Sequence, residues 1–334
     1  MRQYFADVLL NHPWFDPELS SLVLEQGGEV VGFLGRMARP MLFAGRPVRC
    51  AVAMQLMVDP NRKQGFAAIE LIRALQAGPQ DLGFNDGANQ NAVRLWERCG
   101  GQFSRLLSFE WTRRLRPVQS FSLSLRNHAG LRGASRVGHG LAGLVDAVAV
   151  NALPRLFHRP AHGLSCSAAS AREIVPVMGQ VAGSLALSPI YTPQTFAWLL
   201  AKVAEAQQFG VLRSMTVRDD QGQPVGYFIY FVRAGQIAHV LQVAATYGHG
   251  VAVLGTLFRD AWEQGAIAVC GQLDPSLMID LSNSYCQFRC PSLGVLVHSR
   301  NPDILNAIQR GDVFLSRLEG EWWLRLGIDR HADW

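Results

Sequence analysis

The sequence predicts an α+β protein made of two copies of one fold. The chain has 334 residues, and because domains commonly span roughly 100–200 residues, this length favours two of them. Predicted strands and helices alternate in both halves, but a stretch rich in Arg, Ser, Gly and His at about 115–170 interrupts the pattern. Both halves share the order hairpin, long strand, turn, glycine-led helix and short strand, which indicates a duplicated unit.

In the first half, hydrophobic periodicity predicts a hairpin followed by alternating strands and helices. A Gly-Gly turn joins the hairpin strands, Pro60 ends the long strand, and Gly100 ends the second helix. The predicted elements are hairpin strands at 21–25 and 30–36, strands at 48–58, 82–84 and 106–113, and helices at 66–76 and 89–99.

The second half repeats this order with different loop lengths. Gln55 corresponds to Gln242, and Gly65 corresponds to Gly250, so structural pairing and ligand contact are both open for the two glutamines. The predicted elements are helices at 193–207, 250–263 and 275–282, and strands at 212–218, 225–232, 237–245, 267–270 and 294–298. The terminal apolar run at 318–326, which contains two tryptophans, is expected to pack against the second copy.

Composition and charge exclude several classes of protein. The formal net charge is +5, only 17% of residues are charged, and nearly all cations are arginines, the exceptions being Lys63 and Lys202. Nucleic-acid recognition needs a clustered basic face and not net charge alone, so no nucleic-acid partner is expected. We find neither a secretory signal pattern nor a run of about 18 apolar residues, and therefore expect a cytoplasmic protein.

The cysteines and the connecting stretch allow further expectations. Six scattered cysteines are typical of reduced thiols, and Cys286, Cys290 and His298 lack a second ligand pair, so no metal site is expected. An apolar helix at 138–157 is flanked by arginines. Such a helix either lies on an anionic membrane, which would give peripheral contact through 132–159, or docks on a neighbouring domain, and both interpretations stay open.

One segment has the character of a phosphate-binding turn. A strand ends, a short loop turns on Gly65, and a helix begins at once. The unpaired N–H groups and the dipole of a helix N-terminus favour an anion, and small residues at Gly65 and Ala67 let it approach the backbone. Arg62 and Lys63 add positive charge. Neither a Walker ending nor a dinucleotide-binding glycine pattern is present, so the prediction is a phosphate or pyrophosphate site of another kind.

This segment and a later helix resemble the GCN5-related N-acyltransferase (GNAT) family. The family's pyrophosphate loop reads Arg/Gln-x-x-Gly-x-Gly/Ala, and 62–67 reads Arg-Lys-Gln-Gly-Phe-Ala. Its next helix often reads Asn-x-x-Ala-x-x-Leu-Tyr-x-x-x-Gly, and 89–100 matches this pattern with Trp96 in place of Tyr. The resemblance covers about 20–113 well and 172–298 weakly, since Tyr247 replaces Arg or Gln in the second loop.

The resemblance implies two tandem GNAT-like domains, each a mixed, mostly antiparallel sheet with flanking helices, the second copy being degenerate. It implies acetyl-CoA or another acyl-CoA as cosubstrate, held where the first sheet splays, and no metal. The residues implied to contact this cosubstrate are Met57, Val58, Arg62, Lys63, Gln64, Gly65, Phe66, Ala67, Asn89, Ala92 and Trp96.

Proton transfer departs from the family pattern. Trp96 stands where the family commonly has a Tyr that protonates the departing thiolate, and an indole N–H is no acid at neutral pH. Deprotonation of an acceptor amine needs a base, and the candidates are Asp59, Glu110 and His239. Each also has a purely structural interpretation. Asp59 suits a turn before Pro60, Glu110 suits a solvent-facing position on a strand, and His239 suits a hydrogen-bonded histidine in the core.

The sequence therefore favours an acyl-CoA-dependent N-acyltransferase, most simply an acetyltransferase, in which an amine attacks the thioester directly. The expected acceptor is an amine-bearing small molecule or a cell-envelope precursor, and the expected state is a monomer or homodimer. The alternative is a non-catalytic CoA-binding or interaction protein with the same fold. The expected domains are 1–114, in which the family's first strand is missing, a basic linker with a helix at 115–170, and 171–334.

Overall fold

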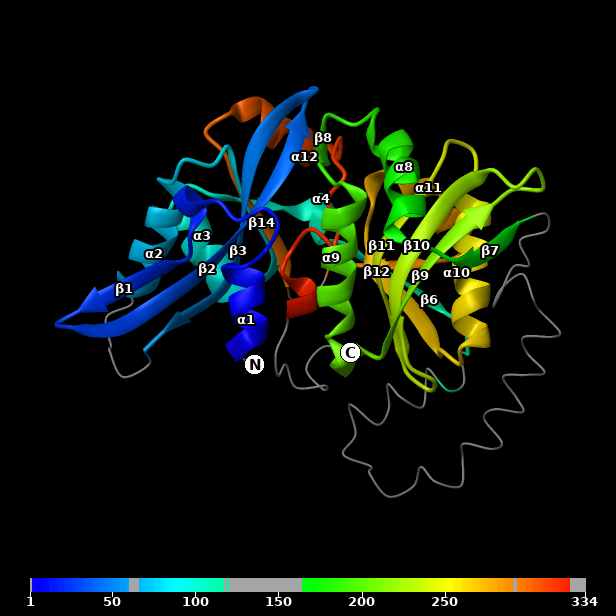
Figure 1. Ribbon diagram of the computed structural model, residues 1–334, viewed down its shortest axis with the longest axis horizontal. Helices are drawn as coiled ribbons and strands as arrows, with labels where there is room; N and C mark the ends of the chain where they lie inside the picture. The colour runs from blue at the N-terminus through cyan, green and yellow to red at the C-terminus, as the bar shows by residue number, and fades with distance from the viewer. Residues whose placement is uncertain (1, 60–65, 117–118, 120–163, 291–292, 325–334) are drawn as a thin grey trace, which may run out of the picture. The chain divides into compact units, whose positions relative to one another are not determined.

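The computed structural model describes residues 2–59, 66–116, 119, 164–290 and 293–324 (Figure 1). These residues form two compact units, each with its own seven-stranded sheet. The described residues of unit 1 lie within Met1–Phe109, Ala182–Lys202 and Cys290–Leu324. Those of unit 2 lie within Glu110–Val181 and Val203–Arg289.

The sheet of unit 1 is mixed. Its strands follow the order β1-β2-β3-β4-β14-β5, and β8 pairs with the far end of β2. Every neighbouring pair is antiparallel except β3 and β4, which run parallel. The strands are β1 (Leu22–Gln26), β2 (Glu29–Phe43), β3 (Arg46–Val58), β4 (Leu82–Ala88), β5 (Gln102–Ser104), β8 (Leu187–Pro189) and β14 (Gly294–His298).

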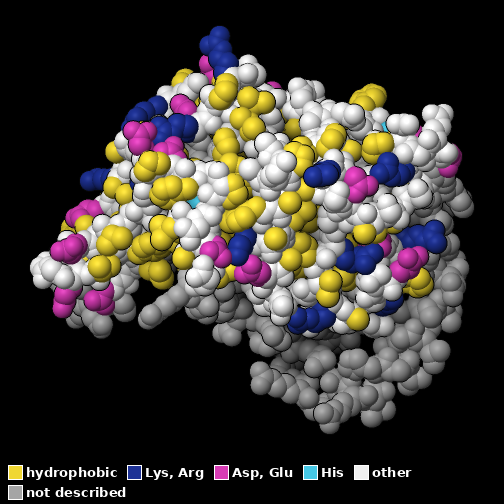
Figure 2. All heavy atoms as spheres, in the orientation of Figure 1, with side chains coloured by type: hydrophobic (Ala, Val, Ile, Leu, Met, Phe, Trp, Pro, Cys, Tyr) yellow, Lys and Arg dark blue, Asp and Glu magenta, His cyan; other side chains and the backbone are white. Residues whose placement is uncertain are grey.

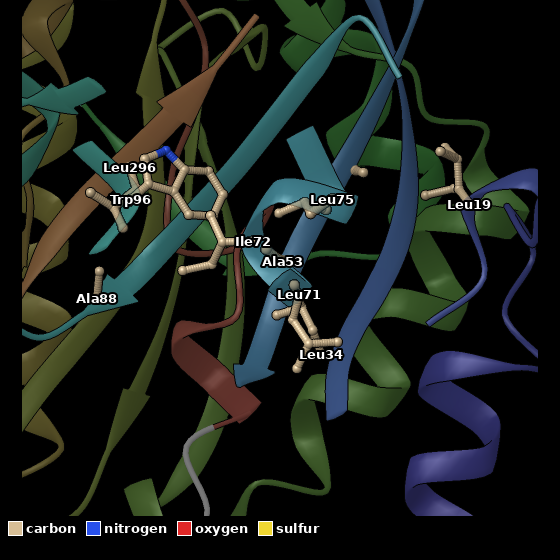
Figure 3. Close-up of a cluster of buried hydrophobic side chains, with 11 residues drawn as sticks. Leu19, Leu34, Ala53, Leu71, Ile72, Leu75, Ala88, Trp96 and Leu296 are labelled. Atoms are coloured by element: carbon tan, nitrogen blue, oxygen red, sulfur yellow. The ribbon is translucent and has the colours of Figure 1, made fainter. Parts of the chain in front are cut away.

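Helix α2 packs its apolar side on this sheet because its leucines and isoleucines recur at helical spacing. Leu71, Ile72 and Leu75 join Ala53 and Trp96 in one buried cluster (Figure 3). The helices placed wholly or largely in unit 1 are α1 (Arg2–Leu9), η1 (Pro17–Leu19), α2 (Phe66–Gln76), α3 (Gln90–Arg98), α4 (Arg105–Ser108), α9 (Pro193–Ala204), α12 (Pro302–Arg310) and η4 (Trp322–Leu324).

Unit 2 repeats the plan with the order β13-β6-β12-β11-β10-β9-β7. Again one pair, β11 with β12, is parallel. Its strands are β6 (Glu110–Arg114), β7 (Ser165–Ala168), β9 (Val211–Arg218), β10 (Pro224–Val232), β11 (Ile237–Ala245), β12 (Ala268–Gln272) and β13 (Gln287–Arg289). The helices among its described residues are α8 (Ala171–Ala182), η2 (Gln207–Phe209), α10 (Gly250–Glu263), η3 (Pro275–Leu277) and α11 (Met278–Asn283).

The two halves of the chain exchange a strand. β14, which follows the second copy in sequence, lies between β4 and β5 of unit 1. β6, which ends the first copy, lies between β12 and β13 of unit 2. The expected contiguous ranges 1–114 and 171–334 therefore differ from the observed units, because strand pairing joins residues that are distant in sequence. Most of the 115–170 stretch, including the predicted helix, lies outside the described residues.

Several predicted elements need correction. The predicted strand at 106–113 is instead helix α4 followed by β6, since the apolar run at its start turns into a helix. Trp322 and Trp323 are buried and belong to unit 1, whereas the sequence predicted that they pack against the second copy. In unit 1, residues 2–19 form α1 and η1, so no strand precedes β1 in the described part of the chain.

The surface bears on two sequence expectations. On the face seen in Figure 2, the described Lys and Arg side chains are interspersed with Asp and Glu and form no continuous basic area. Among the residues that the structure describes, no helix is long and apolar enough to cross a membrane. The 132–159 segment lies outside those residues, so its contact with a membrane stays a prediction.

A cationic side chain is buried in unit 1. Arg39 on β2 is only 2% exposed, and its guanidinium carbon lies 4.4 Å from the centre of the Trp14 ring. Its nitrogens make no hydrogen bond to the described residues. His12, which contacts the Trp14 and Trp198 rings, is also buried. Burial lowers the pKa of His12 from 6.5 to about 4, with a smaller contribution from the positive charge of Arg39. His12 is therefore neutral in the folded protein at neutral pH.

We therefore expect the protein to lose stability in mild acid. Between pH 6.5 and about 4 the unfolded chain binds a proton at His12 that the folded chain does not, so the free energy of unfolding falls as pH decreases through this window, by up to about 3 kcal/mol. Urea unfolding at a series of pH values measures the slope. His12→Leu should flatten it, and a variant with the wild-type slope would contradict the assignment.

Candidate functional site

Strands β3 and β4 of unit 1 diverge after a short paired region. They pair as far as Val52 and Phe84, after which β3 continues to Val58 and β4 to Ala88 without pairing to each other. The outer neighbours of both strands stay paired, so the divergence is confined to this one boundary in the sheet. Backbone donors and acceptors along the separated edges are thereby freed from the ladder.

A β-bulge in β3 lies at the start of the divergence. Phe33 of β2 pairs with Met57 and Gly35 with Met54, so β3 has an additional residue opposite Leu34. Gln55 in the bulge has a φ of 50°, a left-handed conformation that is uncommon for a residue with a side chain. A bulge of this kind turns a backbone N–H out of the strand ladder. The Gln55 N–H accordingly bonds outside the sheet.

The carboxylate of Glu321 bridges the two separated strands. Its Oε2 accepts the Gln55 N–H at 3.0 Å, and its Oε1 accepts Asn85 Nδ2 at 2.7 Å. Asn85 Nδ2 also donates to the Ala53 carbonyl at 2.8 Å, and the Glu321 N–H donates to Asp86 Oδ1 at 2.6 Å. Glu321 is 8% exposed, so these bonds fix a buried carboxylate between β3 and β4.

The chain before Glu321 is anchored in the same unit. Glu319 accepts the Ser316 N–H and hydroxyl on Oε2, at 2.8 and 2.7 Å, and the Tyr191 hydroxyl on Oε1, at 3.0 Å. Burial raises the pKa of Glu319, although its hydrogen bonds and the Arg39 charge oppose the shift. Residues 316–324, called the terminal segment below, are thus anchored in unit 1 by the hydrogen bonds of two carboxylates, those of Glu319 and Glu321.

The end of β3 leads towards the predicted phosphate-binding turn. The predicted contact residues Arg62, Lys63, Gln64 and Gly65 lie outside the described residues. Helix α2 begins at Phe66, as the sequence predicts, and Phe66 is exposed together with Met57 and Val58 at the end of β3. Ala67 is half-buried in the first turn of α2. The described side chains flanking the turn are therefore mainly apolar.

Comparison of the sequence with known proteins finds no match. No protein-family model matches the sequence, and no curated protein matches it. Solved structures, in contrast, match over most of the chain. A GCN5-related N-acetyltransferase from Anabaena variabilis matches with a TM-score of 0.56 and 13% identity, covering 90% of this chain and 66% of its own. A GCN5-related N-acetyltransferase from Kribbella flavida gives 0.51 and 13%, covering 83% and 59%.

N-myristoyltransferase from Saccharomyces cerevisiae, determined with bound myristoyl-CoA, matches with a TM-score of 0.51 and 15% identity, covering 93% of this chain and 75% of its own. The chain has a tandem GNAT fold. Identities this low establish the fold alone. The chain spans 59% and 66% of the lengths of the two acetyltransferases, so their activity does not transfer with the fold.

The second motif of the GNAT resemblance is mainly structural in its described contacts. Asn89 is exposed and caps α3, where its side chain accepts the Ala92 N–H at 2.9 Å. Ala92 is half-buried against the core of unit 1. Trp96 is 3% exposed, and its indole N–H donates to the Val297 carbonyl on β14 at 3.1 Å. Trp96 therefore fills the core and bonds the exchanged strand, a location that argues against contact with a cosubstrate.

Unit 2 differs from unit 1 at the matching helix N-terminus. Helix α10 begins at Gly250, where a Cβ atom would overlap the carboxylate of Asp280. The dipole of the helix thus already faces an internal negative charge, which would repel a phosphate. Gln242, which corresponds to Gln55, accepts a hydrogen bond from the Tyr227 hydroxyl at 2.9 Å in the core.

The three predicted bases are distributed between the units. Asp59 lies in unit 1 at the end of β3, and its N–H donates to the Val31 carbonyl at 2.9 Å. Glu110 lies on β6 in unit 2 and pairs with Arg289 at 3.0 Å. His239 lies on β11 in unit 2, where its Nδ1 is 3.2 Å from the thiol of Cys270. The structure does not bring the three into one unit.

Sequence reasoning missed the residues that connect the separated strands. Asn85, Asp86 and Glu321 have no motif around them, and Glu321 lies 236 residues after Asn85. The one available signal was polar side chains in otherwise apolar runs, the Asn-Asp pair after the 82–84 strand and the Glu beside two tryptophans. Among the described residues, no cluster of three or more His, Cys, Asp or Glu side chains could hold a metal ion.

We expect Trp96→Phe to destabilise unit 1. The substitution removes the hydrogen bond to Val297 and leaves a cavity against α2, so the free energy of unfolding should fall by about 2–3 kcal/mol. Urea denaturation measures the change. Val30→Ala, at an exposed strand position, is the control and should cost less than about 1 kcal/mol. Equal losses in the two variants would contradict the core role of Trp96.

Proposed function

We propose that unit 1 is the catalytic unit of an acyl-CoA-dependent N-acyltransferase. The observation that carries the proposal is the divergence of β3 from β4 with the bulged Gln55 N–H directed into it. Acyl transfer needs a fixed donor near the thioester carbonyl oxygen, where negative charge develops. The tandem GNAT fold supports the proposal, as does the match to an N-myristoyltransferase determined with bound myristoyl-CoA.

Acetyl-CoA or another acyl-CoA is the proposed cosubstrate. Its pyrophosphate would contact the 62–67 turn at the N-terminus of α2, where Arg62 and Lys63 add positive charge. The exposed side chains of Met57, Val58 and Phe66 suit the methylene and dimethyl groups of the pantetheine arm, and its two amides suit the separated backbone edges of β3 and β4. The chemistry of these residues fits an anion attached to a partly apolar chain. Asp280 in unit 2 disfavours the matching position there, which supports unit 1 as the binding unit.

The proposed reaction needs few protein groups. The lone pair of a primary amine attacks the thioester carbonyl carbon, a C–N bond forms, and the C–S bond breaks to release the CoA thiolate. A thiol has an ordinary pKa of about 8.5, so the thiolate leaves without a protein acid, which agrees with Trp96 in the core. Asp59 is the one predicted base in unit 1, and we propose it as the proton acceptor.

The acceptor is proposed to be an amine-bearing small molecule or a cell-envelope precursor, with no nucleic acid involved. A cytoplasmic location and a monomeric or homodimeric state accompany this proposal. Peripheral membrane contact through 132–159 would bring the enzyme to an envelope precursor, whereas a freely diffusing amine would not need it.

We expect Gly65→Glu to abolish binding of acetyl-CoA. A carboxylate at the turn places negative charge where the pyrophosphate should bind, so affinity should fall at least 100-fold by calorimetry, equivalent to about 2.7 kcal/mol. Gly179→Glu is the matched control, since it adds the same charge at an exposed position on α8 and should not change affinity. Absence of wild-type binding at millimolar ligand, or equal binding by both variants, would refute the proposed site.

A non-catalytic CoA-binding protein is the second candidate, and Trp96 favours it because the family's thiolate-protonating residue is replaced by a core side chain. If the protein turns over, acetyl-CoA with a panel of primary amines should give steady release of thiol, detected with a thiol reagent. The release should be lost in Gly65→Glu and retained in Gly179→Glu. Binding without thiol release for every amine would favour the second candidate.

A further inference from the structure

The carboxylate of Glu321 occupies the donor that the proposed reaction needs. Its Oε2 lies 3.0 Å from the backbone nitrogen of Gln55, the N–H that the bulge turns away from the ladder. A carboxylate is a stronger hydrogen-bond acceptor than a thioester carbonyl, because it carries a negative charge. One N–H in this position serves one strong acceptor at a time.

Hydrogen bonds and close packing fix the position of the Glu321 carboxylate. Asn85 bonds its other oxygen at 2.7 Å, and Asp86 Oδ1 accepts the Glu321 N–H at 2.6 Å. A Cβ on Gly87 would lie 2.7 Å from Glu321 Oε1, and a Cβ on Gly320 would overlap the Asp86 carboxylate. The two glycines therefore permit a close approach between the terminal segment and β4.

We propose that Glu321 is an internal competitor for the acyl carbonyl and so sets the preference of unit 1 between acyl-CoA and free CoA. The inference rests on the proposed function. An acyl-CoA must displace Oε2 of Glu321 from the Gln55 N–H, whereas free CoA lacks the thioester carbonyl and leaves that bond intact. The bond from Asn85 to Oε1 can persist, so displacement requires a small rotation of the carboxylate and no unfolding of the terminal segment.

The test compares the dissociation constants of acetyl-CoA and CoA by calorimetry at pH 7.5. In Glu321→Ala the Gln55 N–H has no internal acceptor, so the ratio of the CoA constant to the acetyl-CoA constant should rise about tenfold. Glu321→Gln keeps the shape and loses the charge, so a smaller rise in the same direction is expected. Because both ligands report on the same folded protein, a general loss of stability cancels in the ratio.

The control is Glu319→Gln. Glu319 is a second buried carboxylate in the terminal segment, but it bonds Tyr191 and Ser316 and not the Gln55 N–H. Its variant should keep the wild-type ratio. An unchanged or lowered ratio in Glu321→Ala, with wild-type binding intact, overturns the inference alone. Failure of the wild-type protein to bind either ligand overturns the proposed function and this inference with it.

A second measurement needs no ligand. Amide hydrogen exchange at Gln55 should be slow in the wild-type protein, because the buried carboxylate of Glu321 accepts this N–H. In Glu321→Ala the same amide should exchange at least tenfold faster, while amides in the β2–β3 ladder keep their rates. Equal exchange at Gln55 in both proteins would show that Glu321 does not engage the N–H in solution, and the inference would fail.

Discussion

Strand β14 is the constraint on which unit 1 depends, because it lies inside the sheet and not at its edge. It pairs with β4 on one side and β5 on the other, accepts the Trp96 indole N–H at the Val297 carbonyl, and donates the Val295 N–H to Ser108. The diverging strand β4 is thus supported on its far side only by a segment from the end of the chain. β6 has the equivalent place in unit 2. Neither half of the sequence can complete its own sheet, so each unit needs both halves.

The two units share a fold and differ in what their equivalent positions do. In unit 1 the bulge directs the Gln55 N–H to Glu321, whereas in unit 2 Gln242 is satisfied inside the core by Tyr227. The helix that follows the long strand is preceded by two cations in the first copy and faces the carboxylate of Asp280 in the second. Charge, and not backbone topology, therefore distinguishes the proposed anion site of unit 1 from the matching position in unit 2.

Local sequence patterns predicted the positions of most helices and strands, but they did not predict which distant strands pair. Helix α2 begins and ends where its periodicity indicates, and β1 lies within one residue of its predicted bounds, whereas β2 runs on to Phe43, past the predicted end at 36. The predicted strand at 106–113 failed because an apolar run does not distinguish a short helix from a strand. The placement of β14 and the location of Trp323 could not be predicted, since strand partners are chosen by tertiary packing. The Glu321 bond to Gln55 joins residues 266 apart, which no spacing rule addresses. The prediction of a phosphate-binding turn at 62–65 rests on the sequence motif alone.

The order in which the chain is synthesised gives the terminal segment a further meaning. A ribosome releases the strands β1–β5 and helix α2 first, yet the strand at 294–298 and the carboxylate at residue 321 emerge only after the described strands and helices of unit 2. Domains generally fold as they emerge, but a unit with an inner strand encoded after most of the other unit must wait for that strand. Unit 1 is therefore completed only after the described strands and helices of unit 2 have been synthesised. A nascent chain would therefore carry the 62–67 motif while still lacking both β14 and Glu321, so the divergence between β3 and β4 would have neither its supporting strand nor its bridging carboxylate until these residues emerge.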